Sequence, residues 1–308
     1  MIITTSNYVI KNPGIYTLGK DLTVTGSGFG IKIESGNVVL DLNGFNINNE
    51  SNKSTSAIGV YGQDCSNVII KGGGINGFFY GIRLDNTNST EDGSGNNLVD
   101  GVHVGGSTFR GISLEGAHNS VVNSVIDGVS GTTIYQNAFA CGIEAKGPHA
   151  IISNNLIKEI YATGRGEGLG ISISGFGDNS LVQGNIIKNQ NKTEFRSFGV
   201  WVGGYSYGVD VVSNKIEYMT HAQGWSSVTS GNYAGNVGYQ IEKFGAYTSL
   251  PTLNGVDLNY FTNKSDLVRG NDYSNHFVAM NGDDTIYGEG GDDLIFGGFK
   301  DEVQRLIN

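Results

Sequence analysis

The stretch Gly142-Ile-Glu-Ala145 is one copy of a short phrase that returns through most of the chain: a glycine, an aliphatic residue, a variable residue and usually a second aliphatic residue. Successive copies are 29, 22, 30, 31, 28 and 29 residues apart, counted from glycine to glycine. A repeat of this length indicates one structural unit stacked on the next, and the alternation of apolar and variable residues is typical of a strand. The copies are Gly30-Ile-Lys-Ile33, Gly59-Val-Tyr-Gly62, Gly81-Ile-Arg-Leu84, Gly111-Ile-Ser-Leu114, Gly142-Ile-Glu-Ala145, Gly170-Ile-Ser-Ile173 and Gly199-Val-Trp-Val202.

Two more short apolar segments follow each phrase before the next copy begins. After Gly142 they are Ile151-Ile152 and Leu156-Ile157, and the other repeats follow the same order. Three short strands per repeat predict an all-β chain, a single right-handed parallel β-helix. A doubly wound α/β fold would need helical connections of ten or more residues, which the glycine-broken connections do not offer. Asn155, Asn185 and Asn214 recur at one point of successive repeats, so we expect them to hydrogen-bond along the stack.

The composition divides the chain into two parts. Residues 1–263 are expected to form the β-helix, with residues 2–29 covering its first coil and residues 222–263 forming an irregular end cap and linker. Residues 264–308 carry 9 acidic and 4 basic residues, which is half of the net charge of −10. Such concentrated negative charge suggests a cation site in the tail.

The tail contains a nine-residue repeat, Gly282-Asp-Asp-Thr-Ile286 and Gly291-Asp-Asp-Leu-Ile295. It resembles the calcium-binding nonapeptide repeat of RTX proteins. The resemblance covers about residues 279–298, and an earlier copy at Gly270-Asn-Asp272 is out of step by three residues. It implies a short RTX-type β-roll, with Ca²⁺ bound by Asp283, Asp284, Asp292 and Asp293.

Several classes of protein are disfavoured by composition. A net charge of −10 disfavours nucleic acid as a partner. No apolar run is long enough to span a membrane, and the N-terminus lacks a basic region followed by an apolar block, so we expect no cleaved signal peptide. Strand alternation directs Cys141 inward, which predicts a buried free thiol.

Strand alternation also predicts two columns of side chains that face outward along the stack. Neighbouring strands lie ~4.8 Å apart, so residues of one column should contact their neighbours. The first column is Lys32, Tyr61, Arg83, Ser113, Glu144, Ser172 and Trp201, and the second is Glu34, Gln63, Asp85, Glu115, Lys146, Ser174 and Gly203.

The outward charges crowd into three successive repeats. A solvated face with compensating charges is one interpretation, and a catalytic site is the other. Asp85 and Glu115 should repel each other unless a proton or a cation lies between them. Lys146 is then the best-placed base and Arg83 a charge stabiliser at a sugar carbon next to a carboxylate, while Asp85, Glu115 and Glu144 hold a cation or tune protonation. Without a cation, paired carboxylates could hydrolyse a glycosidic bond instead.

Substrate contacts are expected around this row. Tyr61 and Trp201 suit stacking on sugar rings, although packing under a loop explains each of them equally well. Tyr135 and Arg165 lie on long connections that could wall one side of a groove. His149 is a further catalytic candidate, with an ordinary turn histidine as the alternative. The long connections are residues 128–140, 161–169 and 189–198.

The coils resemble the pectate-lyase-type right-handed β-helix family over about residues 30–220. Gly14-Ile-Tyr-Thr-Leu18 and Val39-Leu-Asp-Leu-Asn-Gly44 are typical of that superfamily. A β-helix followed by RTX repeats is similar to bacterial mannuronan C5-epimerases and related alginate lyases, which implies extracellular action on alginate with Ca²⁺. Those epimerases carry a Tyr-Gly-x-Asp-Pro-His motif. The nearest segment here, Lys146-Gly-Pro-His149, lacks the tyrosine and the aspartate, so no catalytic residue is carried over.

These observations predict a carbohydrate-active enzyme that acts on an acidic, alginate-like polysaccharide by lyase or C5-epimerase chemistry. A glycoside hydrolase is the second hypothesis. The third is a non-catalytic extracellular carbohydrate-binding or adhesin module, for which the outward columns are only a sugar-binding or solvated face.

Overall fold

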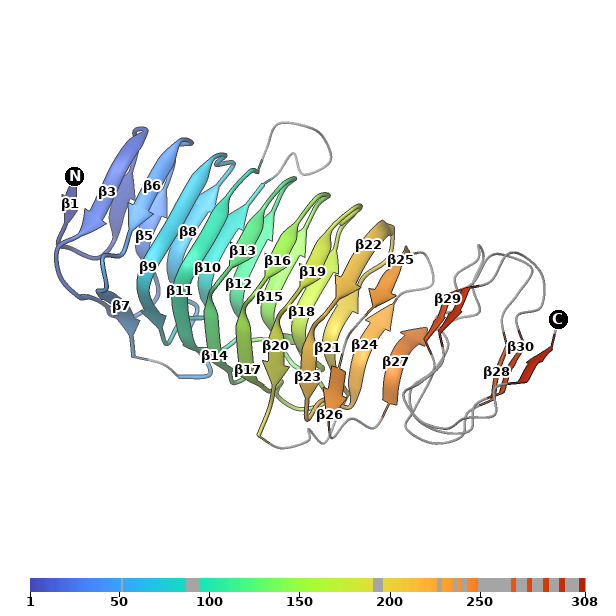
Figure 1. Cartoon of the computed structure of the whole chain (residues 1–308). Coiled ribbons are helices and arrows are strands. Elements are labelled where there is room, and N and C mark those ends of the chain that lie inside the picture. Colours follow the sequence, from blue (N-terminus) through green and yellow to red (C-terminus); the bar gives the residue numbers. More distant parts are fainter. Residues whose placement is uncertain are drawn as a thin grey trace.

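The chain is a right-handed parallel β-helix in which strands of successive coils stack side by side (Figure 1). The computed structural model describes residues 1–50, 52–86, 95–190, 196–225, 229–234, 237–239 and 243–248, together with five short strands between residues 267 and 307. Every regular element in these residues is a strand, and all their pairings are parallel. The predicted fold class is confirmed.

The repeated phrase forms one continuous ten-stranded sheet. Each copy lies in one strand and pairs with the copies before and after it. The strands are β2 (Tyr8–Ile10), β5 (Phe29–Ile33), β8 (Ile58–Gln63), β10 (Tyr80–Asp85), β12 (Arg110–Glu115), β15 (Ala140–Lys146), β18 (Gly168–Ser174), β21 (Ser197–Val202), β24 (His221–Trp225) and β27 (Lys243–Thr248).

The two other apolar segments of each repeat form a 17-stranded sheet with two stacks. Two long strands run through both stacks and join them, β9 (Val68–Asn76) and β11 (Leu98–Ser107). The first stack also contains β1 (Ile2–Ile3), β3 (Gly14–Leu18), β6 (Val38–Asp41), β13 (Ser120–Val122), β16 (Ile151–Ser153), β19 (Leu181–Gln183), β22 (Ser206–Val212) and β25 (Thr229–Ala234). The second also contains β4 (Leu22–Val24), β7 (Asn46–Asn49), β14 (Val125–Val129), β17 (Leu156–Ile160), β20 (Ile186–Lys188), β23 (Lys215–Glu217) and β26 (Val237–Tyr239).

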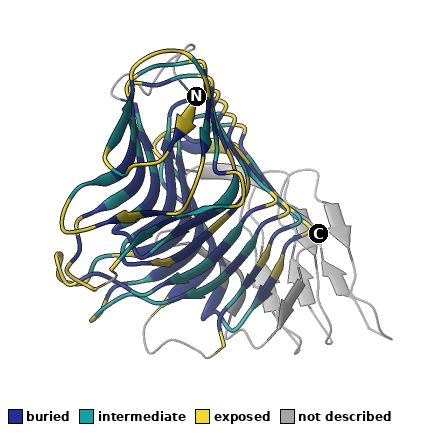
Figure 2. Cartoon of the chain, turned by 90° about the vertical axis from the view of Figure 1, so that its left-hand side faces the viewer, coloured by how far each residue is buried: buried dark blue, intermediate teal, exposed yellow. Residues whose placement is uncertain are grey.

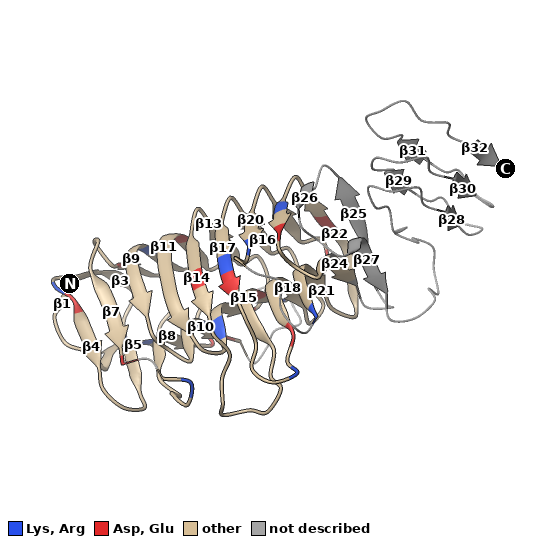
Figure 3. Cartoon of the chain, turned by 90° about the horizontal axis from the view of Figure 1, so that it is seen from below, with Lys and Arg blue, Asp and Glu red and all other residues tan. Residues whose placement is uncertain are grey.

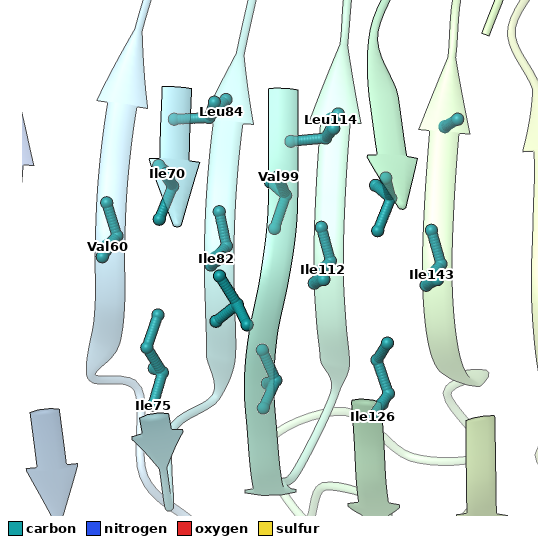
Figure 4. Packing of buried hydrophobic residues seen from close by; sticks show 14 of the residues in the cluster. Val60, Ile70, Ile75, Ile82, Leu84, Val99, Ile112, Leu114, Ile126 and Ile143 are labelled. Atoms are coloured by element: carbon teal, nitrogen blue, oxygen red, sulfur yellow. The ribbon is translucent and has the colours of Figure 1, made fainter. Parts of the chain in front are cut away.

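The core is a set of aliphatic columns enclosed by these sheets. Seen along the stack, buried residues lie mainly on the strands and exposed residues mainly in the turns that connect them (Figure 2). Ile82, Ile112 and Ile143 lie side by side on adjacent strands and are fully buried (Figure 4). Burial of such a side chain stabilises the fold by about 1.5–3 kcal/mol. Strand alternation predicts that the aliphatic residues on either side of the first outward column face inward. Nine of them are confirmed as buried: Ile82, Leu84, Ile112, Leu114, Ile143, Ile171, Ile173, Val200 and Val202.

The first position of each phrase is a glycine because there is no room for a Cβ atom at that position. A Cβ on Gly142 would lie 2.6 Å from the carbonyl oxygen of Gly170 and 2.6 Å from Cγ2 of Ile157 in the core. The missing Cβ of Gly142 therefore points inward, as the side chain of the next residue, Ile143, also does. Two consecutive inward positions interrupt the alternation, and because neighbouring strands share this interruption their register is unchanged. The residue before the glycine consequently faces outward.

This interruption corrects the prediction for Cys141. Its thiol is buried and free, as expected, but it packs with Leu169 and Phe198 in a small cluster separate from the main core. Trp201, an outward residue, packs against the same cluster. Cys141 is thus covered on the outer side of the ten-stranded sheet. Burial raises the pKa of its thiol far above the ordinary range, which makes it unreactive.

The expected asparagine ladder is present inside the turn between the two stacks. The side-chain amide of Asn155 donates to Oδ1 of Asn185 at 3.0 Å, and that of Asn185 donates to Oδ1 of Asn214 at 2.9 Å. The backbone amides of Asn155 and Asn185 donate to the same acceptors. Because these groups are buried, each bond removes a desolvation penalty of about 1–3 kcal/mol.

The ends of the β-helix differ from expectation. Residues 2–24 do not merely cover the first coil, because β2, β3 and β4 form a coil of their own. Residues 222–248 are not irregular throughout, because β25, β26 and β27 pair with the strands before them. These terminal coils lack the glycine phrase in its usual form, so the repeat did not reveal them.

The tail has five described strands in two sheets. One sheet contains β28 (Leu267–Arg269), β30 (Thr285–Tyr287) and β32 (Arg305–Ile307), and the other contains β29 (His276–Val278) and β31 (Leu294–Phe296). The first four strands begin nine residues apart and alternate between the sheets. This alternation is the pattern of a β-roll. In the described part of the chain, no helix is long and apolar enough to cross a membrane.

Candidate functional site

The two predicted outward columns exist in the predicted register. Lys32, Tyr61, Arg83, Ser113, Glu144, Ser172 and Trp201 pair in that order across the ten-stranded sheet. In the second column Asp85 pairs with Gln63, and Lys146 pairs with both Glu115 and Ser174. The structure therefore brings five predicted catalytic residues to three consecutive strands, β10, β12 and β15. They are Arg83, Asp85, Glu115, Glu144 and Lys146.

A sixth charged residue, Arg110, completes this group, which we name the charge cluster. Arg110 is 7% exposed, and its Nε lies 3.4 Å from Oε2 of Glu144. Ser113 donates a hydrogen bond to the same oxygen at 3.0 Å. Lys146 Nζ lies 2.7 Å from Glu115 and 3.7 Å from Glu144. Glu144 is thus a buried carboxylate shared by two cations.

The remaining pair of the cluster lies one coil earlier. Arg83 binds Asp85 through two parallel contacts, Nε to Oδ1 at 2.8 Å and Nη2 to Oδ2 at 2.7 Å. This bidentate geometry is the strong form of a charge-assisted hydrogen bond. Asp85 and Glu115 are therefore each neutralised by a cationic side chain, and their mutual repulsion needs no metal ion. Within the described residues, no three His, Cys, Asp or Glu side chains converge as a metal site.

The environment sets the protonation of these groups. Burial by itself raises the pKa of Glu144, but Arg110, Lys146 and the Ser113 hydroxyl outweigh it and hold that pKa below its ordinary value. For Lys146, burial lowers the pKa, whereas Glu144 and Glu115 more than compensate and raise it. Burial raises the pKa of Asp85, against the opposing effect of Arg83. Lys146 is therefore a firmly protonated ammonium group at neutral pH.

Aromatic rings border the charge cluster at the start of β10 and β12. Phe79 and Phe109 stack with ring centroids 4.8 Å apart, and Tyr80 meets both rings edge-on at 5.1 and 5.4 Å. The guanidinium carbon of Arg83 lies 4.8 Å from the centroid of the Tyr80 ring, and that of Arg110 lies 3.8 Å from the centroid of Phe109. Cation–π contacts of this kind are worth about 0.5–2 kcal/mol.

The predicted substrate-binding residues fall into different surroundings. Tyr61 is partly exposed on β8 and donates to Gln63 at 3.2 Å. Tyr135 is 54% exposed, and its ring lies 6.0 Å from Phe79 and 5.8 Å from Phe109. Trp201 packs edge-on against Phe198 at 5.0 Å, which agrees with the packing interpretation.

The last two predicted residues lie in turns. Arg165 is exposed, and its backbone amide donates to Oδ1 of Asn137 at 2.8 Å. His149 is exposed in the turn after β15 with a φ of 58°, and its ring stacks on His118 at 4.6 Å. This position agrees with an ordinary turn histidine.

Arg110 and Tyr80 were not predicted to face outward, and the reason is the same for both. Each precedes the glycine of a phrase, where strict alternation directs a side chain into the core. The interruption of the alternation at the glycine turns both outward. An arginine at a position assigned to the core was the available signal, because an unpaired buried charge is costly. Seen from below, positions of Lys and Arg alternate with positions of Asp and Glu along the described strands (Figure 3).

One segment of the chain matches a known family. Residues 269–299 match the family model described as RTX calcium-binding nonapeptide repeat (4 copies). This match starts earlier than the predicted 279–298, because β28 and β29 already follow the nine-residue step. Asp283, Asp284, Asp292 and Asp293 lie between the strands of the RTX segment, outside the described residues. No curated protein matches the chain.

Several solved structures are similar to the chain. The Dettilon tailspike protein has a TM-score of 0.49 and 15% identity, and the match covers 96% of this chain and 60% of that one. Tailspike protein 2 from the Escherichia coli O157:H7 bacteriophage CAB120 has a TM-score of 0.46 and 13% identity, with 78% and 38% covered. An alginate lyase from Paenibacillus sp. str. FPU-7 has a TM-score of 0.42 and 12% identity, with 97% and 98% covered. This chain thus spans less than two thirds of each tailspike protein.

Proposed function

We propose that this chain acts on an acidic, uronate-containing polysaccharide such as alginate, by lyase or C5-epimerase chemistry at the charge cluster. The observation that carries the proposal is the convergence of Arg83, Arg110 and Lys146 on three consecutive strands, beside the rings of Tyr80 and Phe109. Cationic side chains recognise carboxylates, and aromatic faces suit the apolar faces of sugar rings.

Both reactions begin with removal of the proton from the sugar carbon next to the carboxylate. Negative charge then develops on that carboxylate, and nearby cations stabilise it. Lys146 suits the role of the cation that stabilises this charge, and as a protonated ammonium it can also donate a proton. It does not suit the role of base that the sequence suggested, because its two carboxylate partners raise its pKa. Asp85, whose pKa is raised by burial, is the better proton acceptor in this proposal.

The two chemistries differ in the step that follows. In a lyase the C4–O bond breaks, a double bond forms between C4 and C5, and the leaving oxygen takes a proton. In an epimerase a proton returns to C5 from the opposite face, and no bond of the chain is cut. Incubation with a panel of uronans and neutral glycans separates them. Ultraviolet absorbance from unsaturated ends indicates a lyase, and solvent deuterium at C5 without cleavage indicates an epimerase.

A matched pair of variants tests whether the charge cluster carries the activity. Lys146→Ala should lower turnover about 100-fold or more. The melting temperature should fall only modestly, because Lys146 is half-buried and Arg110 still pairs with Glu144 when Lys146 is removed. Lys158→Ala is the control, because Lys158 also bridges two coils, with Nζ 2.8 Å from Asp127, but on the other sheet. Equal turnover for both variants would exclude Lys146 from the reaction.

A non-catalytic glycan-binding module is the second candidate. One observation favours it: each cation of the charge cluster already has a carboxylate partner, so the cluster is complete without substrate. In that case no glycan on the panel is altered, yet an acidic oligosaccharide still binds, and Lys146→Ala weakens its binding. New reducing ends without unsaturation would instead indicate a glycoside hydrolase.

The RTX segment adds two proposals about the setting of this function. Carboxylate and backbone oxygens suit Ca²⁺, so we propose that Asp283, Asp284, Asp292 and Asp293 bind it. We also propose that the protein works outside the cell, where polysaccharides of this kind occur.

A further inference from the structure

The connection after β14 forms a strap, residues 130–139, that runs back across earlier coils. The backbone amide of Thr133 donates to the carbonyl oxygen of Lys53 at 2.8 Å, and the hydroxyl of Thr132 donates to the same oxygen at 3.2 Å. Lys53 precedes β8, and Thr132 is 79 residues further along the chain. Between these ends, the ring of Tyr135 packs against Phe79 and Phe109. The strap therefore lies beside the aromatic border of the charge cluster.

The other end of the strap is fastened by Arg110. Nη1 of Arg110 donates hydrogen bonds to the carbonyl oxygens of Phe139 and Phe109, the second at 3.2 Å. The same guanidinium lies on the ring of Phe109 and places its Nε 3.4 Å from Glu144. One buried side chain thus contacts the strap, the aromatic border and the shared carboxylate.

We propose that Arg110 is a positioning residue that ties the strap to the Glu144–Lys146 pair. Its planar fork reaches two directions at once, toward the Phe139 carbonyl and toward Glu144, and a lysine head group cannot do so. If Arg110 is lost, the strap loses its attachment next to β15, and the rings of Phe79 and Phe109 become accessible. Lys146 would then be the one remaining cationic partner of Glu144, and the stronger attraction between them would draw Lys146 away from Glu115.

This inference deepens the proposed function, and its consequence for the reaction rests on that function. A strap fastened beside the charge cluster limits which glycans reach the aromatic border, so Arg110 would affect substrate affinity. Glu144 would affect the chemical step through Lys146. On a processed uronan, Arg110→Lys should raise KM about tenfold with little change in kcat, and Glu144→Gln should chiefly lower kcat.

Two readouts test the structural part without any activity. The first is hydrogen exchange of the Thr133 amide, which is protected by its bond to Lys53. The second is the titration of Lys146 Nζ followed by NMR. We expect Arg110→Lys and Arg110→Met to speed exchange at Thr133 at least tenfold while core amides such as that of Ile171 stay protected. Glu144→Gln should leave Thr133 protected but lower the pKa of Lys146, because one of its two anionic partners is gone.

Lys158→Ala is the control and should change neither readout. Wild-type exchange at Thr133 in Arg110→Met would overturn the proposal. If Arg110→Met destabilises the whole β-helix, Arg110→Lys is the milder variant for the same comparison. Faster exchange spread evenly over the whole β-helix in both variants would also overturn the proposal. If no glycan is processed but both readouts move as expected, the proposed function fails and the role of Arg110 stands.

Discussion

Replacing Gly142 with alanine probes the contact that sets the shape of each coil. The added methyl group would lie 2.6 Å from the carbonyl oxygen of Gly170 and 2.6 Å from Cγ2 of Ile157, both closer than real Cβ contacts allow. Ile157 is packed in the core, and the Gly170 oxygen belongs to the next coil, so neither can move freely. We expect the free energy of unfolding to fall by about 2–4 kcal/mol. If Gly142 faced solvent, as strict alternation requires, alanine would instead stabilise the fold by about 0.4–1 kcal/mol.

Urea denaturation followed by circular dichroism measures this difference. Gly44→Ala is a suitable control, because a Cβ there meets nothing within 4 Å and only its φ of +77° is strained, at about 1–2 kcal/mol. Adding Ile157→Ala to the Gly142→Ala variant should relieve the side-chain half of the clash. The cost of Ile157→Ala should then be at least ~1 kcal/mol smaller than in the wild type. Additive effects, or a stabilised Gly142→Ala variant, would refute the inward direction of this position.

Three further perturbations test other parts of the molecule. Ile143→Asp places an unpaired charge among the core columns and should cost several kcal/mol, so wild-type melting of this variant would contradict the register. Glu144→Gln should destabilise the chain at pH 7 by about 3 kcal/mol. The partners of Glu144 lower its pKa in the folded chain, so its contribution to the free energy of unfolding is present above the ordinary pKa of 4.5 and is lost as the pH falls below it. The free energy of unfolding, measured at pH 7 and at pH ~3, should therefore differ less between variant and wild type in acid. Removal of Ca²⁺ by a chelator should speed proteolysis within residues 265–308, and equal cleavage with and without Ca²⁺ would count against the calcium site.

Much of the fold could be predicted from the sequence because each coil repeats the same physical problem. The phrase, its spacing and the two apolar segments after it identify the strands, and register follows because a slip by one residue would expose every inward side chain. Cys141 is a buried free thiol as predicted, but its predicted inward direction was wrong, because the alternation is broken at the glycine and spacing alone does not show such a break. It failed at the ends because the first and last coils keep their strands without the glycine phrase.

The site was predictable only as far as the repeat extends. The columns placed Arg83, Asp85, Glu115, Glu144 and Lys146 together, since register fixes which residues are neighbours. Register does not determine side-chain conformation. Compensating charges were one interpretation of the sequence, but which cation pairs with which carboxylate was not predicted. The attachment of the strap could not be predicted either. Its bond to Lys53 joins positions 79 residues apart, and this separation is not part of the repeat.

The sequence separation of the residues that hydrogen-bond between coils has a consequence for how the chain folds. Bonds between coils join residues about 30 positions apart, as between Asn155 and Asn185, which is a short separation for a chain of 308 residues. A ladder of such local contacts can nucleate in any coil and grow in either direction. The strap is different, because Thr132 reaches across 79 residues to Lys53 and needs the intervening coils as its surface. It should therefore dock last during folding and detach first during unfolding, so a nearly native chain with an open aromatic border is the species that precedes the finished protein.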